Sequence, residues 1–110
     1  MKIDKNLLSG STSMLVLSLL AREEMYGYQM IVELSRRSDQ SFQLKEWTLY
    51  PILHSLEAEK LVTAREKTAE NGRKRRYYRI TPQGLQALEE KKEAFHFFTE
   101  KVKAVVSAPG

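Results

Sequence analysis

The chain has 110 residues, of which 42% are apolar and 29% charged, a composition that indicates one globular domain and excludes a disordered or collagen-like chain. It contains no cysteine, which excludes disulfide bridges, thiolate nucleophiles and zinc–thiolate sites. The longest apolar run, residues 14–21, is too short to span a bilayer, and residues 1–8 lack the pattern of a signal peptide. We therefore expect a cytoplasmic protein with no membrane partner.

The positive charge is concentrated in one segment. The net charge of the chain is +4, yet residues 60–79 hold eight basic and two acidic side chains, so the rest of the chain is net negative. The eight basic residues are Lys60, Arg65, Lys67, Arg73, Lys74, Arg75, Arg76 and Arg79. A local basic patch is the expected footprint of a surface that binds a polyanion.

Two short helices are predicted first. Residues 8–21 and 27–37 carry apolar side chains at helical spacing, and a polar break at residues 22–25 separates them. Candidate N-cap residues for the first helix are Ser9, Ser11 and Thr12. A loop is expected at residues 38–41, followed by a very short strand at residues 42–44.

Residues 46–60 are predicted to form a third helix. Four apolar side chains make one stripe that we expect to pack in the core: Leu49, Ile52, Leu53 and Leu56. Pro51 lacks a backbone N–H and is best tolerated in the first helical turn, so we expect the helix to begin about one turn before it.

Residues 61–67 and 73–80 are predicted to be paired strands. The Asn-Gly pair at residues 71–72 is a strong signal for the turn of a hairpin. Side chains alternate along a strand, so Tyr78 would face one side of the hairpin and Tyr77 the other.

Thr81 followed by Pro82 predicts the start of a last helix, with the threonine as N-cap and the proline at the first helical position. This helix extends to about residue 106 and is the longest element. Its apolar stripe, which we assign to a dimer interface, comprises Leu88, Phe95, Phe98, Val102 and Val105. A small core cannot cover a stripe of that length, and a second copy of the chain would. The alternative is a helix folded back on its own core.

This order of elements is that of a winged helix-turn-helix domain followed by a dimerisation helix. We expect a mainly α fold with a small β-hairpin, in which residues 1–81 form the DNA-binding domain and residues 82–107 the C-terminal dimerisation helix. In such domains the third helix enters the major groove of double-stranded DNA, and the hairpin, or wing, lies along the backbone or minor groove.

The face of the third helix opposite the core stripe carries side chains that suit this role. They are Trp47, Pro51, His54 and Ala58, with Thr48 and Tyr50 beside them. We predict that DNA is contacted by Lys45, Thr48, Tyr50 and His54. The alternative is that Trp47 and Tyr50 only cover the edge of the core.

Four consecutive basic residues follow the predicted turn: Arg73, Lys74, Arg75 and Arg76. Their cationic groups suit phosphate oxygens. Four or five such contacts would make log K fall with log salt concentration at a slope of roughly −4. The alternative is a charge run that only keeps a small domain soluble.

Other functions find less support. His54 and His96 are isolated from metal-ligand and triad partners, and no Gly-rich phosphate loop is present, so we expect no metal, no cofactor and no enzymatic activity. Phe95 and Phe98 would line a pocket for a planar aromatic effector, with plain interface packing as the alternative. The alternative to a regulator is a winged-helix protein–protein interaction module without sequence-specific DNA binding.

The segments EWTLYPILHSLEAEKLV, GRKRRYYRITPQG and MLVLSLLAREEMYGYQM resemble the PadR-like family of bacterial transcriptional regulators, over about residues 8–106. That family has a Leu-Tyr-Pro recognition helix, a wing that closes with Tyr-Tyr, and a Tyr-Gly-Tyr opening of the second helix. The resemblance implies a dimeric winged-helix regulator, usually a repressor, of the compact branch that includes multidrug sensors. It implies DNA contacts from Tyr50 and from the four basic residues of the wing.

The chain departs from the family pattern at two places. Some drug-binding members carry on the last helix a tryptophan that stacks planar ligands, whereas this chain has residues 95–98 there and its tryptophan, Trp47, on the recognition helix. Residues 59–61, Glu-Lys-Leu, replace the frequent Gly before Leu or Ile. We expect only a small backbone adjustment at that turn.

Overall fold

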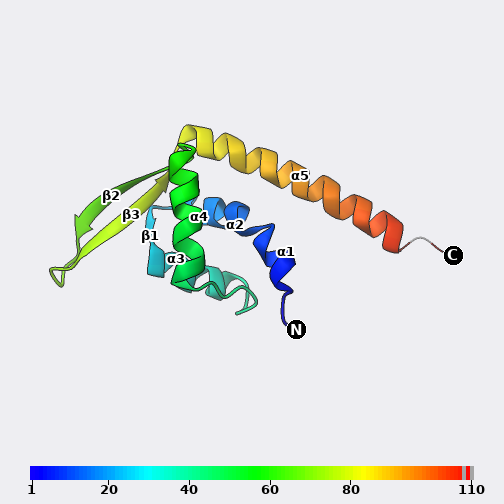
Figure 1. Ribbon diagram of the computed structural model, residues 1–110, viewed down its shortest axis with the longest axis horizontal. Coiled ribbons are helices and arrows are strands. Elements are labelled where there is room, and N and C mark those ends of the chain that lie inside the picture. Colours follow the sequence, from blue (N-terminus) through cyan, green and yellow to red (C-terminus); the bar gives the residue numbers. More distant parts are fainter. Residues whose placement is uncertain (108, 110) are drawn as a thin grey trace.

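The computed structural model describes residues 1–107 and 109 of the chain. Its helices and strands are, in chain order, α1 (Lys5–Ser9), α2 (Thr12–Leu20), β1 (Met25–Tyr26), α3 (Gly27–Arg37), α4 (Glu46–Ala58), β2 (Val62–Thr68), β3 (Lys74–Ile80) and α5 (Pro82–Val106). The β2–β3 hairpin projects from a helical body, and α5 begins beside the base of the hairpin, runs along the body and projects beyond it in the opposite direction (Figure 1). The molecule is accordingly elongated, 62 × 31 × 21 Å.

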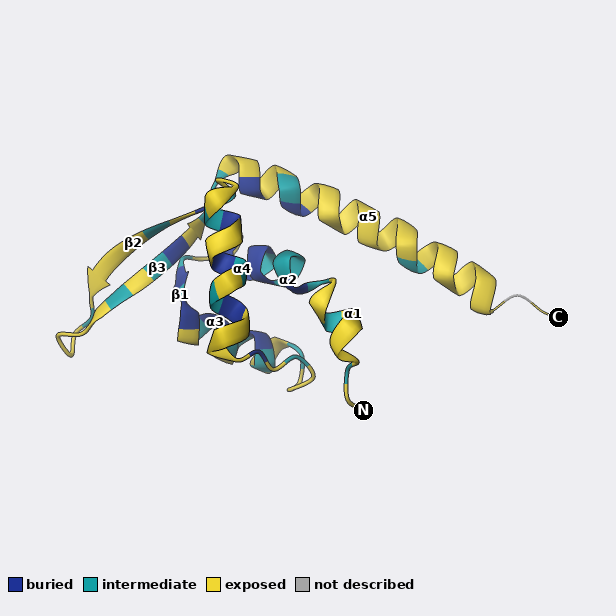
Figure 2. Cartoon of the chain, viewed as in Figure 1, coloured by how far each residue is buried: buried dark blue, intermediate teal, exposed yellow. Residues whose placement is uncertain are grey.

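The core lies between α2, α3, α4 and the inner face of the sheet. Val16 and Leu17 of α2, Leu49 and Leu53 of α4, and Tyr78 of β3 are fully buried. The two α4 leucines are one turn apart, so they share the helix face that packs inward. Figure 2 shows buried positions concentrated in this body, while most of α5 is exposed.

Three of the predicted helices are confirmed. α3 and α5 have the predicted bounds, and α4 begins at the predicted residue and ends slightly early, at Ala58. Pro51 lies inside α4, a little more than one turn from its start. At the start of α5, the backbone N–H of Gly84 donates to Thr81 Oγ1 at 2.9 Å, so Thr81 is the N-cap.

The prediction of one helix over residues 8–21 is wrong. The chain forms two helices, α1 and α2, which are separated at Gly10 and Ser11. α1 begins before the predicted start because Asp4 Oδ1 accepts a hydrogen bond from the backbone N–H of Asn6 at 2.8 Å and caps the helix. Ser11 is the N-cap residue of α2, but its side chain makes no capping hydrogen bond.

The sheet has three strands, in the order β1–β3–β2, of which the sequence predicts only the two of the hairpin. β1 pairs antiparallel with β3, with Met25 opposite Tyr78 and Tyr26 opposite Tyr77. The two residues of β1 are too few to show an alternating pattern, so the polar break predicted at residues 22–25 conceals the strand.

The strand predicted at residues 42–44 is wrong, because this segment is a loop that leads into α4. The backbone N–H of Phe42 donates to Ser38 Oγ at 2.9 Å, and Leu44 is buried. The alternation of apolar residues there reflects packing of a loop against the core.

The β2–β3 hairpin is confirmed, with each strand beginning one residue later than predicted. Val62 lies opposite Ile80 at the base of the hairpin, and Thr68 lies opposite Lys74 near its tip. Tyr78 is buried against the body, and Tyr77 lies on the other face of the sheet, as the alternation predicts.

The turn after α4 keeps the geometry of a glycine turn without a glycine. Lys60 has φ of +64°, in the left-handed region. The backbone N–H of Leu61 donates to the Leu56 carbonyl oxygen at 2.9 Å, which closes α4 in a Schellman-type motif. Lys60 thus adopts the left-handed conformation that glycine favours.

The root of α5 is fixed to this turn. Thr81 Oγ1 donates to the Lys60 carbonyl oxygen at 2.8 Å, and the Thr81 backbone N–H donates to the Leu61 carbonyl oxygen at 3.0 Å. A Cβ atom on Gly84 would collide with that Leu61 carbonyl oxygen, so the first turn of α5 lies directly on the chain that leaves α4.

Candidate nucleic-acid interface

The outward face of α4 is open to solvent. Its exposed side chains, with that of the N-cap residue, are Lys45, Trp47, Thr48, Pro51, His54, Ser55 and Ala58. Trp47 is 76% exposed, and Lys45 Nζ lies 5.9 Å from the centre of its ring. Of the residues predicted to contact DNA from this helix, Lys45, Thr48 and His54 lie on this open face.

Tyr50 is placed differently. It is half-buried, and a Cβ atom on Gly27, the first residue of α3, would lie 2.6 Å from Tyr50 Oη. The pKa of the Tyr50 hydroxyl is raised, mainly because the group is partly buried and to a lesser extent because of the electrostatic effect of Glu46 and Tyr78. The hydroxyl of Tyr50 therefore closes the contact between α3 and α4.

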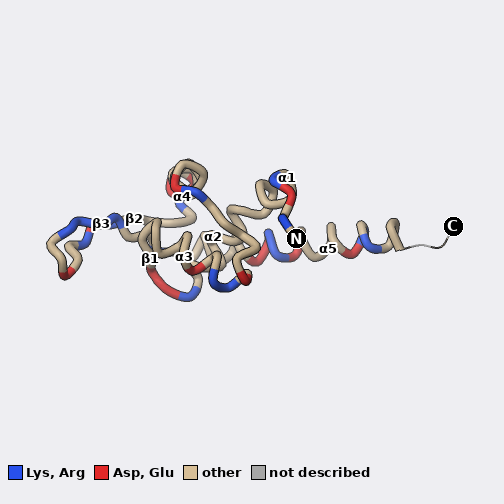
Figure 3. Tube along the Cα trace, turned by 90° about the horizontal axis from the view of Figure 1, so that it is seen from below, with Lys and Arg blue, Asp and Glu red and all other residues tan. Residues whose placement is uncertain are grey.

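We call residues 62–80 the wing. The tip of the wing is a tight turn. Gly72 has φ of +83°, which a side chain would strain. The backbone N–H of Arg73 donates to Asn71 Oδ1 at 3.1 Å. The side chains of Arg73 and Lys74 are exposed and have no ion-pair partner among the described residues. Figure 3 shows the basic positions of the wing gathered along the hairpin, at the end of the molecule far from the C-terminus.

The next two basic residues of the wing already have partners. Arg76 Nη2 lies 2.9 Å from Glu57 Oε2, and this ion pair, which ties the wing to α4, is the main cause of the raised pKa of Arg76. Arg75 has its guanidinium carbon 4.3 Å from the centre of the Tyr26 ring. The two arginines lie on opposite faces of the hairpin, so the four basic residues predicted to bind phosphate are not equivalent.

A second ion-pair cluster lies on the outer face of the sheet. Glu24, just before β1, accepts hydrogen bonds from Arg65 Nε and Nη2, each at 3.0 Å, and Lys67 Nζ lies 2.7 Å from Glu24 Oε1. Arg65 first and then Lys67 lower the pKa of Glu24 to about 2. The cluster holds β2 to the segment before β1, and the sequence does not reveal it because Glu24 and Arg65 are 41 residues apart.

The free surface of α5 is shorter than the sequence predicts. Leu88, assigned above to the dimer interface, is 3% exposed and packs in the core of its own chain. Beyond it, residues 89–107 are exposed apart from the half-buried Thr99. Phe95, Phe98 and Val102 line a cavity of about 610 Å³ against α1, and Val105 is exposed further along.

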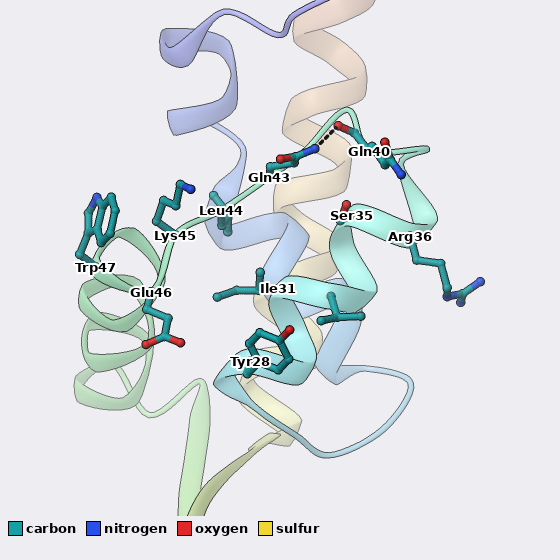
Figure 4. A pocket seen from close by; sticks show the side chains of 11 residues that line it. Tyr28, Ile31, Ser35, Arg36, Gln40, Gln43, Leu44, Lys45, Glu46 and Trp47 are labelled. Carbon is teal, nitrogen blue, oxygen red and sulfur yellow. Dashed lines mark hydrogen bonds between the residues drawn. The ribbon is translucent and has the colours of Figure 1, made fainter.

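A groove of about 890 Å³ lies between α3 and the start of α4 (Figure 4). Tyr28 and Val32 of α3 line it, 59% and 47% exposed, together with Glu46 and Trp47 of α4. No sequence pattern indicates this groove, because it depends on the angle at which the two helices meet.

Among the described residues, no group of His, Asp and Glu side chains is arranged to hold a metal ion. In the same part of the chain, no helix combines the length and apolar character that a membrane span requires.

These features define a class of protein. A three-helix body with one open helix face, flanked by a basic hairpin, is the winged helix-turn-helix arrangement of DNA-binding proteins. The chain belongs to the PadR-like family of transcriptional regulators, since residues 16–90 match the family model described as "Transcriptional regulator PadR-like family". The resemblance seen in the sequence is thereby confirmed.

Individual relatives agree with this assignment. The transcriptional regulator Rv3488 of Mycobacterium tuberculosis is 37% identical over 79% of this chain and 78% of the relative. The transcriptional regulator YqjI of Escherichia coli is 30% identical over 86% of this chain but only 44% of that longer relative. The crystal structure of a PadR family transcriptional regulator from Eggerthella lenta superposes with a TM-score of 0.83, at 32% identity, over 94% of this chain and 88% of that one.

Proposed function

We propose that this regulator is a homodimeric repressor that binds a palindromic operator in double-stranded DNA. The observation that carries the proposal is the layout of the molecule. The open face of α4 lies beside a wing whose tip bears Arg73 and Lys74, two cations without an ion-pair partner among the described residues. An α5 arm with uncovered apolar side chains projects in the direction opposite to the wing (Figure 1).

In this proposal α4 enters the major groove and the wing lies on the DNA backbone. Lys45, Thr48 and His54 contact DNA from α4, while Tyr50 sets the angle between α3 and α4. Arg73 and Lys74 bind phosphates directly. The guanidinium groups of Arg75 and Arg76 already contact Tyr26 and Glu57, so each must divide its interactions between that partner and a phosphate.

The dimer is formed by α5. Phe98 is 61% exposed, and Phe95, Val102 and Val105 are exposed with it, an apolar surface of the kind that marks a protein–protein interface. A second copy of the chain is the simplest partner, because two-fold dimers are the commonest oligomers. Two-fold symmetry of the protein matches two-fold symmetry of an operator.

A planar aromatic effector would occupy the cavity between α1 and α5. Its volume of about 610 Å³ suits a small molecule, and Phe95 and Phe98 offer aromatic faces. Thermal-shift measurements with planar aromatic cations should show stabilisation of the wild type that is lost in Phe98→Ala. An unchanged melting temperature for the wild type would favour plain interface packing.

The operator proposal is tested by selecting bound sequences from random duplex DNA. We expect enrichment of an inverted repeat whose half-sites are centred about one helical turn, roughly 10 bp, or a multiple apart. Transcription in vitro from a promoter carrying that sequence should then fall when the protein is added. Failure to enrich any sequence would contradict operator binding, and a rise in transcription would contradict repression.

A further inference from the structure

Trp47 has an unusually exposed side chain, which suggests that a binding partner covers it. Tryptophan is rarely left in water, because its ring has a large apolar surface. Yet Trp47 is 76% exposed, and it lies on α4, away from the Phe95–Phe98 cavity between α1 and α5. Figure 4 shows its ring projecting outward from the first turn of α4, at the rim of the groove.

The surroundings of Trp47 favour an anionic partner. Lys45 Nζ lies 5.9 Å from its ring centre, and the wing carries Arg73 and Lys74, which have no ion-pair partner among the described residues. A partner that covers Trp47 must therefore combine negative charge with an apolar group. Double-stranded DNA has both, and α4 is the element that the proposed function places in its major groove.

The chemistry of the major groove restricts what an indole can recognise. The base edges there offer hydrogen-bond donors and acceptors and only one apolar group, the C5 methyl of thymine. An indole has one N–H donor and no acceptor, so it fits no exposed amino group of adenine or cytosine. Guanine and adenine also offer acceptors to the indole N–H, but only thymine has a methyl group that packs on the apolar ring.

We infer that Trp47 is a specificity-determining residue that reads a thymine in each half-site through its C5 methyl group. The inference rests on the proposed function and adds a preference that the fold alone does not supply. Burying one methyl group corresponds to about a fourfold gain in affinity per half-site, or roughly fifteenfold for both half-sites of a dimer.

The test uses the full chain and the duplex recovered by selection, with each symmetric pair of thymines replaced in turn by uracil, which removes only the methyl groups. Binding is followed by the fluorescence anisotropy of labelled DNA, and contact by the emission of Trp47, which is the one tryptophan of the chain. We expect one symmetric pair of replacements to weaken binding about fifteenfold, and binding of the unmodified duplex to change the tryptophan emission.

Two variants separate the contact from the fold. Trp47→Phe keeps an aromatic face and should keep the preference for thymine over uracil, whereas Trp47→Gln should bind both duplexes equally. Both changes are at an exposed position, so they should leave the melting temperature nearly unchanged.

The outcomes are distinguishable. Sequence-specific binding with no sensitivity to any uracil, or with the same sensitivity in Trp47→Gln, overturns the inference and leaves the proposed function standing. A wild type that binds no duplex overturns both.

Discussion

At the scale of single residues, Lys60 holds a backbone conformation that its side chain disfavours. Its φ of +64° lies in the left-handed region, which costs a residue with a Cβ atom roughly 1–2 kcal/mol. The turn keeps this conformation because Leu61 N–H bonds back to Leu56 and Thr81 Oγ1 bonds to the Lys60 carbonyl oxygen.

We expect Lys60→Gly to stabilise the protein by roughly 0.5–1 kcal/mol, after allowing for the greater flexibility of glycine in the unfolded chain. Urea denaturation at fixed protein concentration measures the change in the free energy of unfolding. The matched control is Glu59→Gly, one residue earlier at φ −81°, which should be destabilising. A destabilising Lys60→Gly would contradict this account of the turn.

At the scale of elements, the sheet depends on the ionised form of Glu24. Its folded pKa of about 2 is below the ordinary value of 4.5, because Arg65 and Lys67 stabilise the carboxylate. A depressed folded pKa contributes stability that is fully present above pH 4.5 and is lost as the pH falls towards 2. Glu33, whose pKa is also lowered to about 2 by Arg36 and Arg37, adds to the same loss.

In Glu24→Gln, the difference in unfolding free energy between pH 6 and pH 2 should therefore be smaller than in the wild type. The reduction should be at most about 1 kcal/mol, since partly exposed ion pairs contribute little. Denaturation curves at several pH values measure this difference. Glu70→Gln, near the wing tip and without an ion pair among the described residues, is the control and should keep the wild-type difference. Equal pH profiles for Glu24→Gln and the wild type would contradict a role for the cluster.

The wing offers a second test at this scale, since its cations differ in their partners. Arg73→Ala and Lys74→Ala should each flatten the slope of log K against log salt concentration by about 1 for every phosphate contact removed. Arg76→Ala should change the slope less, because Glu57 already pairs with Arg76. Salt titrations of operator binding measure the slopes, and identical slopes for all three variants would show that the pairing has no influence on DNA contact.

The elements that the sequence predicts well are those with strong local chemistry. Thr81-Pro82 marks the start of α5, and Asn71-Gly72 marks the turn of the hairpin, because each pair sets the backbone without help from elsewhere. β1 is missed because its two residues become a strand only by pairing with β3. The additional helix α1 depends on a cap at Asp4, outside the apolar pattern.

The candidate site was predicted less completely than the fold. The open face of α4 follows from helical periodicity, but the inward hydroxyl of Tyr50 depends on the missing side chain of Gly27 on another helix. Leu88 and Phe98 share one apolar stripe, and only the three-dimensional structure shows that the body covers the first and not the second. The partners of Arg75 and Arg76 lie on other elements, so a run of basic residues cannot reveal them.

At the scale of the whole molecule, dimerisation should depend on the far half of α5. Phe98→Glu places a charge on the apolar surface that lines the cavity with α1, so we expect a monomer by sedimentation and weaker binding to a full operator, with single half-site binding retained. Phe97→Glu is the matched control, because Phe97 is similarly exposed but does not line that cavity. A dimer that survives Phe98→Glu would place the interface elsewhere.

Because the start of α5 is fixed to the body, a small rotation there produces a large displacement at its far end. Its 25 residues span about 37 Å, and Thr81 and Gly84 hold one end against the turn after α4. A swing of roughly 5° about that pivot moves the other end by about 3 Å, close to the 3.4 Å rise of one base pair. In the proposed dimer, a compound bound beside α1 would thus need only a slight tilt of each α5 to move the two α4 helices out of register with their half-sites.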